Sequence, residues 1–253
     1  MLFSHGFGCD QQMWRFVAPA FEGDHDVILH DHVGAGSSDI NSWSPERYAT
    51  LQGYADDLIE LVDALDTRGG VFVGHSVAAM IGVLASNTSP GLFSHLILVT
   101  PSPRYINDPE KSYIGGFDAA EIDDMLAVMS DNHLGWSHQV ATVIMANPER
   151  PALATELDNS FCRTDPKIAE HFARVTFTSD NRSDLAHVLV PSLILACADD
   201  TIAPRSIGRY LADELVDSEL VELDATGHCP HLSAPDDVIR EIKSYLLRCQ
   251  TTR

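Results

Sequence analysis

The sequence VGHSVAAM, residues 73–80, places a serine between an apolar run and an apolar, helix-like segment. The run GVFVG at 70–74 has strand character, and SVAAMIGVLAS at 76–86 has the composition of a buried helix. A strand that turns sharply into a helix through a serine flanked by small residues is typical of a nucleophile elbow. Glycine is usual at the position of Ala78, but alanine adds only one methyl group. We therefore expect Ser76 to be a nucleophile; the alternative is that Ser76 only caps the helix.

The chain around this turn alternates short apolar runs with helical patterns. Segment 51–66 carries its apolar side chains on one helical face, and segment 235–247 begins with proline and acidic residues, as helices often do. Five runs have strand character and lack polar alternation, as strands buried on both faces do: DVILHD (26–31), GVFVG (70–74), HLILVT (95–100), SLILAC (192–197) and ELVELD (219–224). This order predicts an α/β fold, a mostly parallel twisted sheet with helices on both faces.

The alternation stops between residues 103 and 187, where several helical stretches occur without a convincing strand. This segment has more apolar and aromatic residues than an exposed linker needs, so it should pack over something. We expect residues 1–102 and 188–253 to form the α/β core and residues 103–187 to form a helical lid over the active site. Four side chains of this segment are expected to face the substrate pocket: Phe117, Trp136, Met145 and Phe161.

Charge excludes several classes of partner. The 253 residues contain 37 Asp and Glu against 16 Lys and Arg, a formal net charge of -21. Such a chain is repelled by phosphate backbones and by anionic membrane surfaces. We therefore expect neither nucleic-acid binding nor membrane binding.

The cysteines and the start of the chain bear on location and on metals. Five cysteines without a CxxC pair fit reduced thiols better than a disulfide framework or a zinc site, so we expect no metal and no cofactor. The opening MLFSHGFG (1–8) lacks the charged and long apolar regions of a secretory signal. No stretch approaches the length of a membrane span, and a cytoplasmic location is expected.

A serine nucleophile needs an imidazole base and a carboxylate that orients it, and on this architecture they follow in the order serine, acid, histidine. Asp199 and Asp200 come directly after the run SLILAC, and His228 follows ELVELD on a loop that contains a glycine. Alone, each could be a turn acid or a surface histidine. Together, in order and each just beyond a strand, they predict a catalytic triad.

The oxyanion of an acyl-transfer reaction needs backbone N–H donors from the residue after the nucleophile and from a loop after an early strand. The N–H groups of Val77 and Phe7 are the candidates. Glycines at positions 6 and 8, in SHGFG, allow a backbone path that side chains would block. The alternative is an ordinary glycine turn.

Several motifs resemble one known family across nearly the whole chain. They are HGFGCDQQMW, DHVGAGSSD, VGHSVAAMIGVLAS, FSHLILVTPSPRYIND, FCRTDP, PSLILACADDTIAP and GHCPHLS. The chain resembles the α/β-hydrolase family, specifically the RsbQ-like bacterial stress-response hydrolases and the plant karrikin and strigolactone receptors. In that family the acid precedes a proline by four positions, so the resemblance selects Asp200, before Pro204, over Asp199. It also implies Ser76 as nucleophile, His228 as base, Phe7 and Val77 as the oxyanion hole, and a lid of four helices.

The chain departs from the family pattern in two ways. Ala78 replaces the glycine of the elbow and should crowd the turn slightly. Family members also carry about twenty residues, in two antiparallel edge strands, before the stretch that is Met1 here. We therefore expect the N-terminal edge strands to be missing, with a cost in stability rather than in chemistry.

Three functions remain open. The first is a serine hydrolase that acts on a small, largely apolar ester or lactone. The second is a signalling receptor that hydrolyses slowly and binds a partner protein, for which the resemblance suggests a sensor phosphatase. The third is non-acyl chemistry on the same fold, because fold does not determine function.

Overall fold

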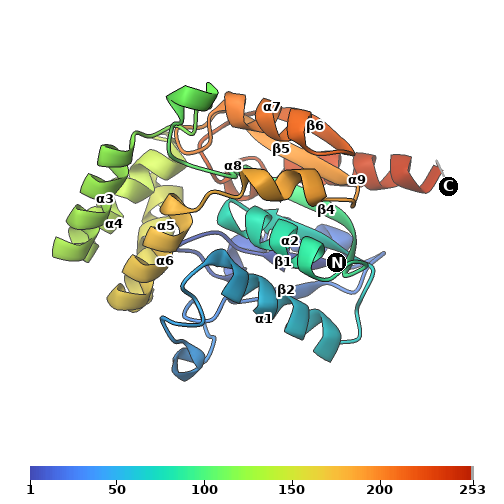
Figure 1. Cartoon of the computed structure of the whole chain (residues 1–253), viewed down its shortest axis with the longest axis horizontal. Helices are drawn as coiled ribbons and strands as arrows, with labels where there is room; N and C mark the ends of the chain where they lie inside the picture. The colour runs from blue at the N-terminus through green and yellow to red at the C-terminus, as the bar shows by residue number, and fades with distance from the viewer. Residues whose placement is uncertain (252–253) are drawn as a thin grey trace.

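A six-stranded, fully parallel sheet forms the centre of the protein in a computed structural model that describes residues 1–251 (Figure 1). The strand order is β2-β1-β3-β4-β5-β6. The strands are β1 (Leu2–Ser4), β2 (Ile28–His30), β3 (Gly70–His75), β4 (Phe93–Val99), β5 (Ser192–Asp199) and β6 (Ser218–Thr226). The sheet confirms the predicted fold class, and all five predicted strands are present. β1 is the additional strand, and its three residues are too few to show a hydrophobic pattern.

Helices cover both faces of this sheet, as the apolar strands require. Successive residues of a strand point to opposite faces, so Phe72 packs with α1, α2 and α7, whereas Val71 and Val73 pack with α9. The helices of the two faces are α1 (Leu51–Ala64), α2 (Val77–Thr88), α7 (Arg205–Glu214) and α9 (Pro235–Thr251). The short helix α8 (Pro230–Ser233) precedes α9.

Four helices separate β4 from β5 and lie together beside the sheet (Figure 1). They are α3 (Ala119–Asp131), α4 (His133–Met145), α5 (Pro151–Arg163) and α6 (Pro166–Thr178). Residues 103–187, which we call the helical insertion, contain two isolated β-bridges and no named strand within the part of the chain that is described. The boundaries of the two parts and the role of the insertion as a lid stay predictions.

The sheet topology determines where a site forms. From β1 the chain moves outward to β2 and then crosses back to β3, which pairs with the other edge of β1. The connections that leave the carboxyl ends of β1 and β3 therefore run in opposite directions and leave a crevice, the usual ligand position in open parallel sheets. The glycine loop after Ser4 and the turn after His75 both begin at this crevice.

None of the helices within residues 1–251 combines the length and apolar character needed to cross a membrane.

Candidate active site

Ser76 lies between the last residue of β3 and the first residue of α2. Its backbone has φ 57° and ψ −123°, a region that non-glycine residues rarely adopt. The Ser76 N–H donates to the carbonyl of Val99 in the neighbouring strand, 2.9 Å away. The strained turn is thus held by the sheet, and it directs the serine side chain over the crevice.

The turn depends on small residues at two places. A Cβ added at Gly74 would lie 2.8 Å from the carbonyl oxygen of Ala78, and one added at Gly6 would lie 2.6 Å from Nδ1 of His75. Real Cβ atoms do not approach other atoms so closely. Ala78 is fully buried inside α2, so its methyl group is accommodated where the elbow pattern usually has glycine.

Ser76, His228 and Asp200 form one continuous hydrogen-bond chain. Oγ of Ser76 lies 2.8 Å from Nε2 of His228, and Nδ1 of the same ring lies 2.7 Å from Oδ2 of Asp200. Because a carboxylate only accepts, the ring proton is on Nδ1, and Nε2 accepts the hydrogen bond from the serine hydroxyl. All three residues are buried. In this arrangement the imidazole can take the serine proton as Oγ attacks an electrophile.

The structure distinguishes the two adjacent aspartates. Asp199 is exposed, whereas Asp200 is buried against His228. The other oxygen of Asp200, Oδ1, accepts the backbone N–H groups of Ile202 and Ala203 at 2.8 and 3.0 Å. These bonds orient the carboxylate toward the imidazole.

Three hydrogen bonds and a close backbone approach at Gly227 hold the loop that carries His228. Its N–H donates to the carbonyl of Ile144 at the end of α4, 2.8 Å away. Its own carbonyl accepts from Thr100 Oγ1 at 3.0 Å and from His75 Nε2 at 2.8 Å. Gly227 has φ 88°, and a Cβ there would lie 2.1 Å from the carbonyl of Met145. The helical insertion therefore helps to position the histidine.

The predicted oxyanion donors belong to the residue after the serine, Val77, and to Phe7, which lines the same cavity as Ser76. Val77 is the first residue of α2, so its N–H has no intrahelical partner. The N–H of Phe7 makes no backbone hydrogen bond within residues 1–251. The adjacent Gly8 has φ 71°, and a Cβ there would lie 1.8 Å from the ring of Phe161. The glycines of this loop thus give the backbone the path that the sequence predicted.

Tyr105 also reaches Ser76, and sequence reasoning assigned it no role. Its hydroxyl lies 3.2 Å from Ser76 Oγ, and the residue is buried. Burial raises the pKa of Tyr105 to about 12, so the phenol is protonated at neutral pH. Because the serine proton is directed to His228, Tyr105 donates to Oγ. Its position a few residues beyond β4 is the signal that could have identified it, since ligand sites collect at the carboxyl ends of parallel strands.

A cavity of about 20 Å³, roughly the room for one water molecule, lies over Ser76 and His228. Its described lining contains no Asp, Glu, Lys or Arg. Most of the lining is apolar or aromatic: Phe7, Cys9, His75, Ser76, Tyr105, Ile144, Leu157, Thr176, Phe177, Ile202, His228 and Cys229.

The four side chains that the sequence predicted for the pocket are absent from this lining. Trp136, Met145 and Phe161 are buried in the same apolar cluster as several lining residues, and Phe117 is partly buried against it. On α4 the lining residue is Ile144, and its neighbour Met145 points elsewhere because successive helix residues differ by about 100°. The four residues therefore lie behind the lining, and their part in substrate binding stays a prediction.

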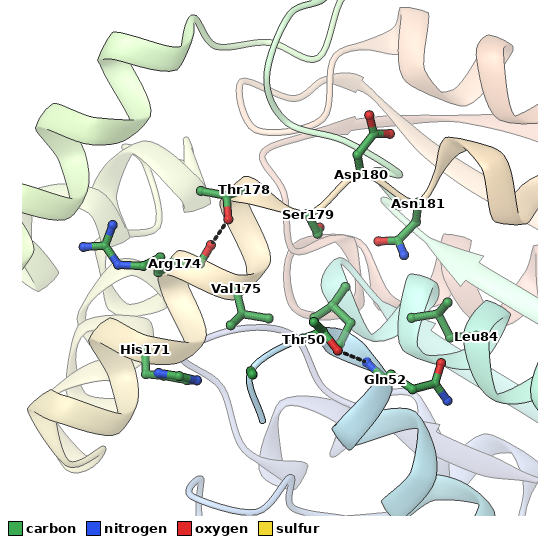
Figure 2. Close-up of a pocket in the computed structure, with 12 residues that line it drawn as sticks. Thr50, Gln52, Leu84, His171, Arg174, Val175, Thr178, Ser179, Asp180 and Asn181 are labelled. Atoms are coloured by element: carbon green, nitrogen blue, oxygen red, sulfur yellow. Dashed lines mark hydrogen bonds between the residues drawn. The ribbon is translucent and has the colours of Figure 1, made fainter. Parts of the chain in front are cut away.

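A larger hollow of about 510 Å³ lies elsewhere, between α6 and the start of α1 (Figure 2). Its walls include Gln52, His171, Arg174 and Asp180, and Ser76 is not among its described lining residues. Another hollow, of about 620 Å³, lies between α4 and α5, so volume alone would select neither the site of Figure 2 nor the cavity over Ser76. The hydrogen-bonded serine, histidine and aspartate select the smaller cavity, because they supply a nucleophile and a base.

Comparisons with known proteins identify the family of the chain. Residues 1–241 match the alpha/beta hydrolase family. Strigolactone esterase D14 of Arabidopsis thaliana is 38% identical over 249 residues, 98% of this chain and 92% of the relative. Karrikin insensitive 2 receptor CA of Petunia hybrida is 36% identical over 240 residues, 94% and 88% of the two chains. The solved structure of a hydrolase from Oleispira antarctica superposes with a TM-score of 0.94 at 38% identity and covers 97% of this chain and 90% of that one.

Proposed function

This chain belongs to the alpha/beta hydrolase family and is a hydrolase, and we propose that it is a serine hydrolase of small, largely apolar esters or lactones. The observation that carries the proposal is the hydrogen-bond chain from Asp200 through His228 to Ser76, which ends in a cavity without charged walls. The relatives named esterases support the same reaction class.

In the proposed reaction, Ser76 Oγ attacks the substrate carbonyl while His228 Nε2 takes the serine proton. The N–H groups of Phe7 and Val77 stabilise the oxyanion that forms. His228 then protonates the leaving alkoxide, and the product is an acyl-serine. Water, deprotonated by the same imidazole, releases the acid and restores Ser76. Asp200 holds the ring with Nδ1 protonated throughout.

The walls of the cavity support a choice of substrate class. Side chains of the helical insertion close over Ser76, among them Ile144, Leu157 and Phe177, so the insertion acts as the lid. A charged substrate would lose its hydration on entering, at a cost of several kcal/mol without a compensating partner. The small volume means that the lid opens to admit any substrate larger than water.

A fluorophosphonate probe tests the chemistry. The probe should label the wild-type protein at Ser76, because the serine hydroxyl is activated by His228. Labelling should disappear in His228→Ala, and peptide mapping should find the adduct on the peptide that contains residue 76. Labelling at another residue, or undiminished labelling of His228→Ala, would refute the assignment. In a second arm, short-acyl aryl esters should be hydrolysed and a dianionic ester should not.

A second function, a receptor with slow turnover, is favoured by the receptor-named relatives and by the nearly closed cavity. A receptor changes shape when a ligand is bound and needs little catalytic power. Rapid-quench kinetics separate the two functions. A burst of acyl-enzyme followed by very slow release, together with binding of a signalling protein such as a sensor phosphatase, would favour the receptor. Steady multiple turnover favours the metabolic enzyme.

A further inference from the structure

Three buried side chains gather next to the proposed catalytic residues. His75 directly precedes Ser76, Cys229 directly follows His228, and His231 lies in α8. Each is at most 2% exposed. One donor atom of each side chain lies within 4.8 Å of the corresponding atoms of the other two. The fold that brings Ser76 next to His228 therefore also brings together the imidazoles of His75 and His231 and the thiol of Cys229.

The imidazole nitrogens in this group lack partners. Within residues 1–251, neither Nδ1 nor Nε2 of His231 makes a hydrogen bond, and Nδ1 of His75 makes none either. The ring of His231 is held between the rings of Trp14 and His75, with centroids 4.7 and 4.3 Å away. A buried polar group without a partner costs on the order of 1–3 kcal/mol. Packing thus holds these rings in place, and their nitrogens are available to a ligand.

The hydrogen bonds around His75 leave a lone pair for a metal ion. Because Nε2 of His75 donates to the carbonyl of His228, the lone pair of this imidazole is on Nδ1, the atom without a partner. Cys229 is a buried free thiol next to it. A bound divalent ion removes the thiol proton.

One positive charge opposes a cation. Arg15 contributes to the lowered pKa of His231. Its guanidinium, however, forms a two-bond ion pair with Glu156, with an N···O distance of 2.7 Å in one of the bonds. The charge of Arg15 is therefore largely balanced before a metal ion approaches.

We propose that His75, Cys229 and His231 form a zinc site. Two imidazoles and one thiolate suit this ion, and three protein ligands are typical of zinc sites with an open fourth position. Ligand atoms around tetrahedral zinc lie about 3.5 Å apart, so side-chain rotations that shorten the separations by about 1 Å complete the site. His75 and Cys229 also line the cavity over Ser76, so the ion reaches the site along the substrate route.

Zinc at this site should inhibit hydrolysis. Its ligands are the sequence neighbours of Ser76 and His228, and His75 Nε2 donates to the carbonyl of His228. Contraction of the three ligands around an ion would shift both reacting side chains from their 2.8 Å contact. Small displacements of this kind lower the rate strongly.

Equilibrium dialysis against Zn²⁺ tests binding. Tag-free wild-type protein should retain one zinc per chain, and Cys229→Ser and His231→Gln should each lose it. The matched control is Cys162→Ser, because Cys162 is an exposed thiol outside the cluster, and this variant should bind as the wild type does. Circular dichroism checks that each variant is folded. A wild type that retains no zinc, or folded Cys229→Ser that retains it fully, overturns the proposal.

A second measurement needs no variant. A thiol loses its proton when it becomes a zinc ligand, so binding of zinc through Cys229 should release close to one proton. Titration calorimetry in two buffers with different ionisation enthalpies measures this number. Cobalt(II) in place of zinc should show thiolate-to-metal charge-transfer absorption. Binding with no proton release and without this absorption would exclude Cys229 as a ligand.

The inhibitory effect rests on the proposed hydrolase function and is tested separately. Zinc should inhibit aryl-ester hydrolysis by the wild type, a chelator should reverse this, and the inhibition constant should rise roughly tenfold or more in His231→Gln. Equal inhibition of both proteins would overturn the inhibitory role. Failure of the proposed function would appear differently, as an absence of ester hydrolysis in zinc-free protein while zinc binding persists.

Discussion

Asp200 and Asp199 are neighbours in sequence with different surroundings. The carboxylate of Asp200 is fully enclosed and bonded to His228 and to two backbone N–H groups, whereas the side chain of Asp199 is exposed. Asp199 meets the histidine loop through its backbone, where its carbonyl accepts the N–H of Gly227. A substitution in the side chain leaves that contact intact.

Asp200→Asn should therefore lower kcat by about 10³- to 10⁴-fold, because an amide leaves His228 in the wrong tautomer. Asp199→Asn should change kcat by about twofold or less, as surface substitutions usually do. Initial rates on an aryl acetate measure both effects, with thermal melts as the control for folding. A large loss of kcat in Asp199→Asn together with a small loss in Asp200→Asn would identify Asp199 as the acid that orients the imidazole.

At the scale of elements, the helical insertion and the sheet contribute different parts of the site. β3 and α2 supply the strained serine, and the loops after β5 and β6 supply Asp200 and His228. Helices α4, α5 and α6 supply Ile144, Leu157 and Phe177, which close the cavity. In the proposed reaction the sheet thus holds the reacting groups, and we propose that the insertion limits the size of the substrate.

Leu157→Ala should enlarge the cavity without touching a reacting group. A pocket that accommodates one further methylene of a substrate gains about tenfold or more in kcat/KM for it. The ratio of kcat/KM for a longer-acyl aryl ester to that for a shorter one should therefore rise about tenfold or more in the variant. The cost in the free energy of unfolding should be about 2–5 kcal/mol. Leu134→Ala, at a leucine of α4 that is 64% exposed, is the matched control. An unchanged acyl-chain preference in Leu157→Ala would show that this side chain does not limit the substrate.

At the scale of the whole molecule, several neutral histidines lie close to the sheet and the site. Burial, together with the neighbouring His5, lowers the pKa of His30 to about 4, and burial lowers that of His231 to about 3, from 6.5 in both cases. Above pH 6.5 these rings are neutral in both the folded and the unfolded chain. Below it the unfolded chain binds protons that the folded chain does not, so stability falls as the pH falls.

The free energy of unfolding should therefore decrease between pH 6.5 and about 4, by up to about 1.4 kcal/mol per pH unit for each such histidine. Urea denaturation at a series of pH values measures this slope. His231→Gln should reduce the slope, whereas Leu134→Ala should not, because Leu134 is 64% exposed and has no titratable group. An equal slope in wild type and His231→Gln would mean that His231 is already protonated in the folded state.

Local sequence determined much of this protein. Apolar runs without polar alternation belong in a parallel sheet, and the small residues around Ser76 permit one particular turn, so the fold class and the elbow could be predicted. The order of the pair Asp199 and Asp200 and of His228, each just after a strand, predicted where the acid and the base lie, and the family resemblance selected Asp200. These features depend on a few adjacent residues, and their physical causes are local.

Only the tertiary structure decided which side chains meet. It contributed the tyrosine hydroxyl on Ser76, the choice of Ile144 over Met145 as cavity wall, and the meeting of His75 with Cys229 and His231. The sequence predicted no metal site because its cysteines lack a CxxC spacing, and the zinc site that we propose joins side chains from segments about 150 residues apart. Contacts of this kind depend on strand order, on helix rotation and on the packing of the insertion, and a local pattern in the chain contains none of these.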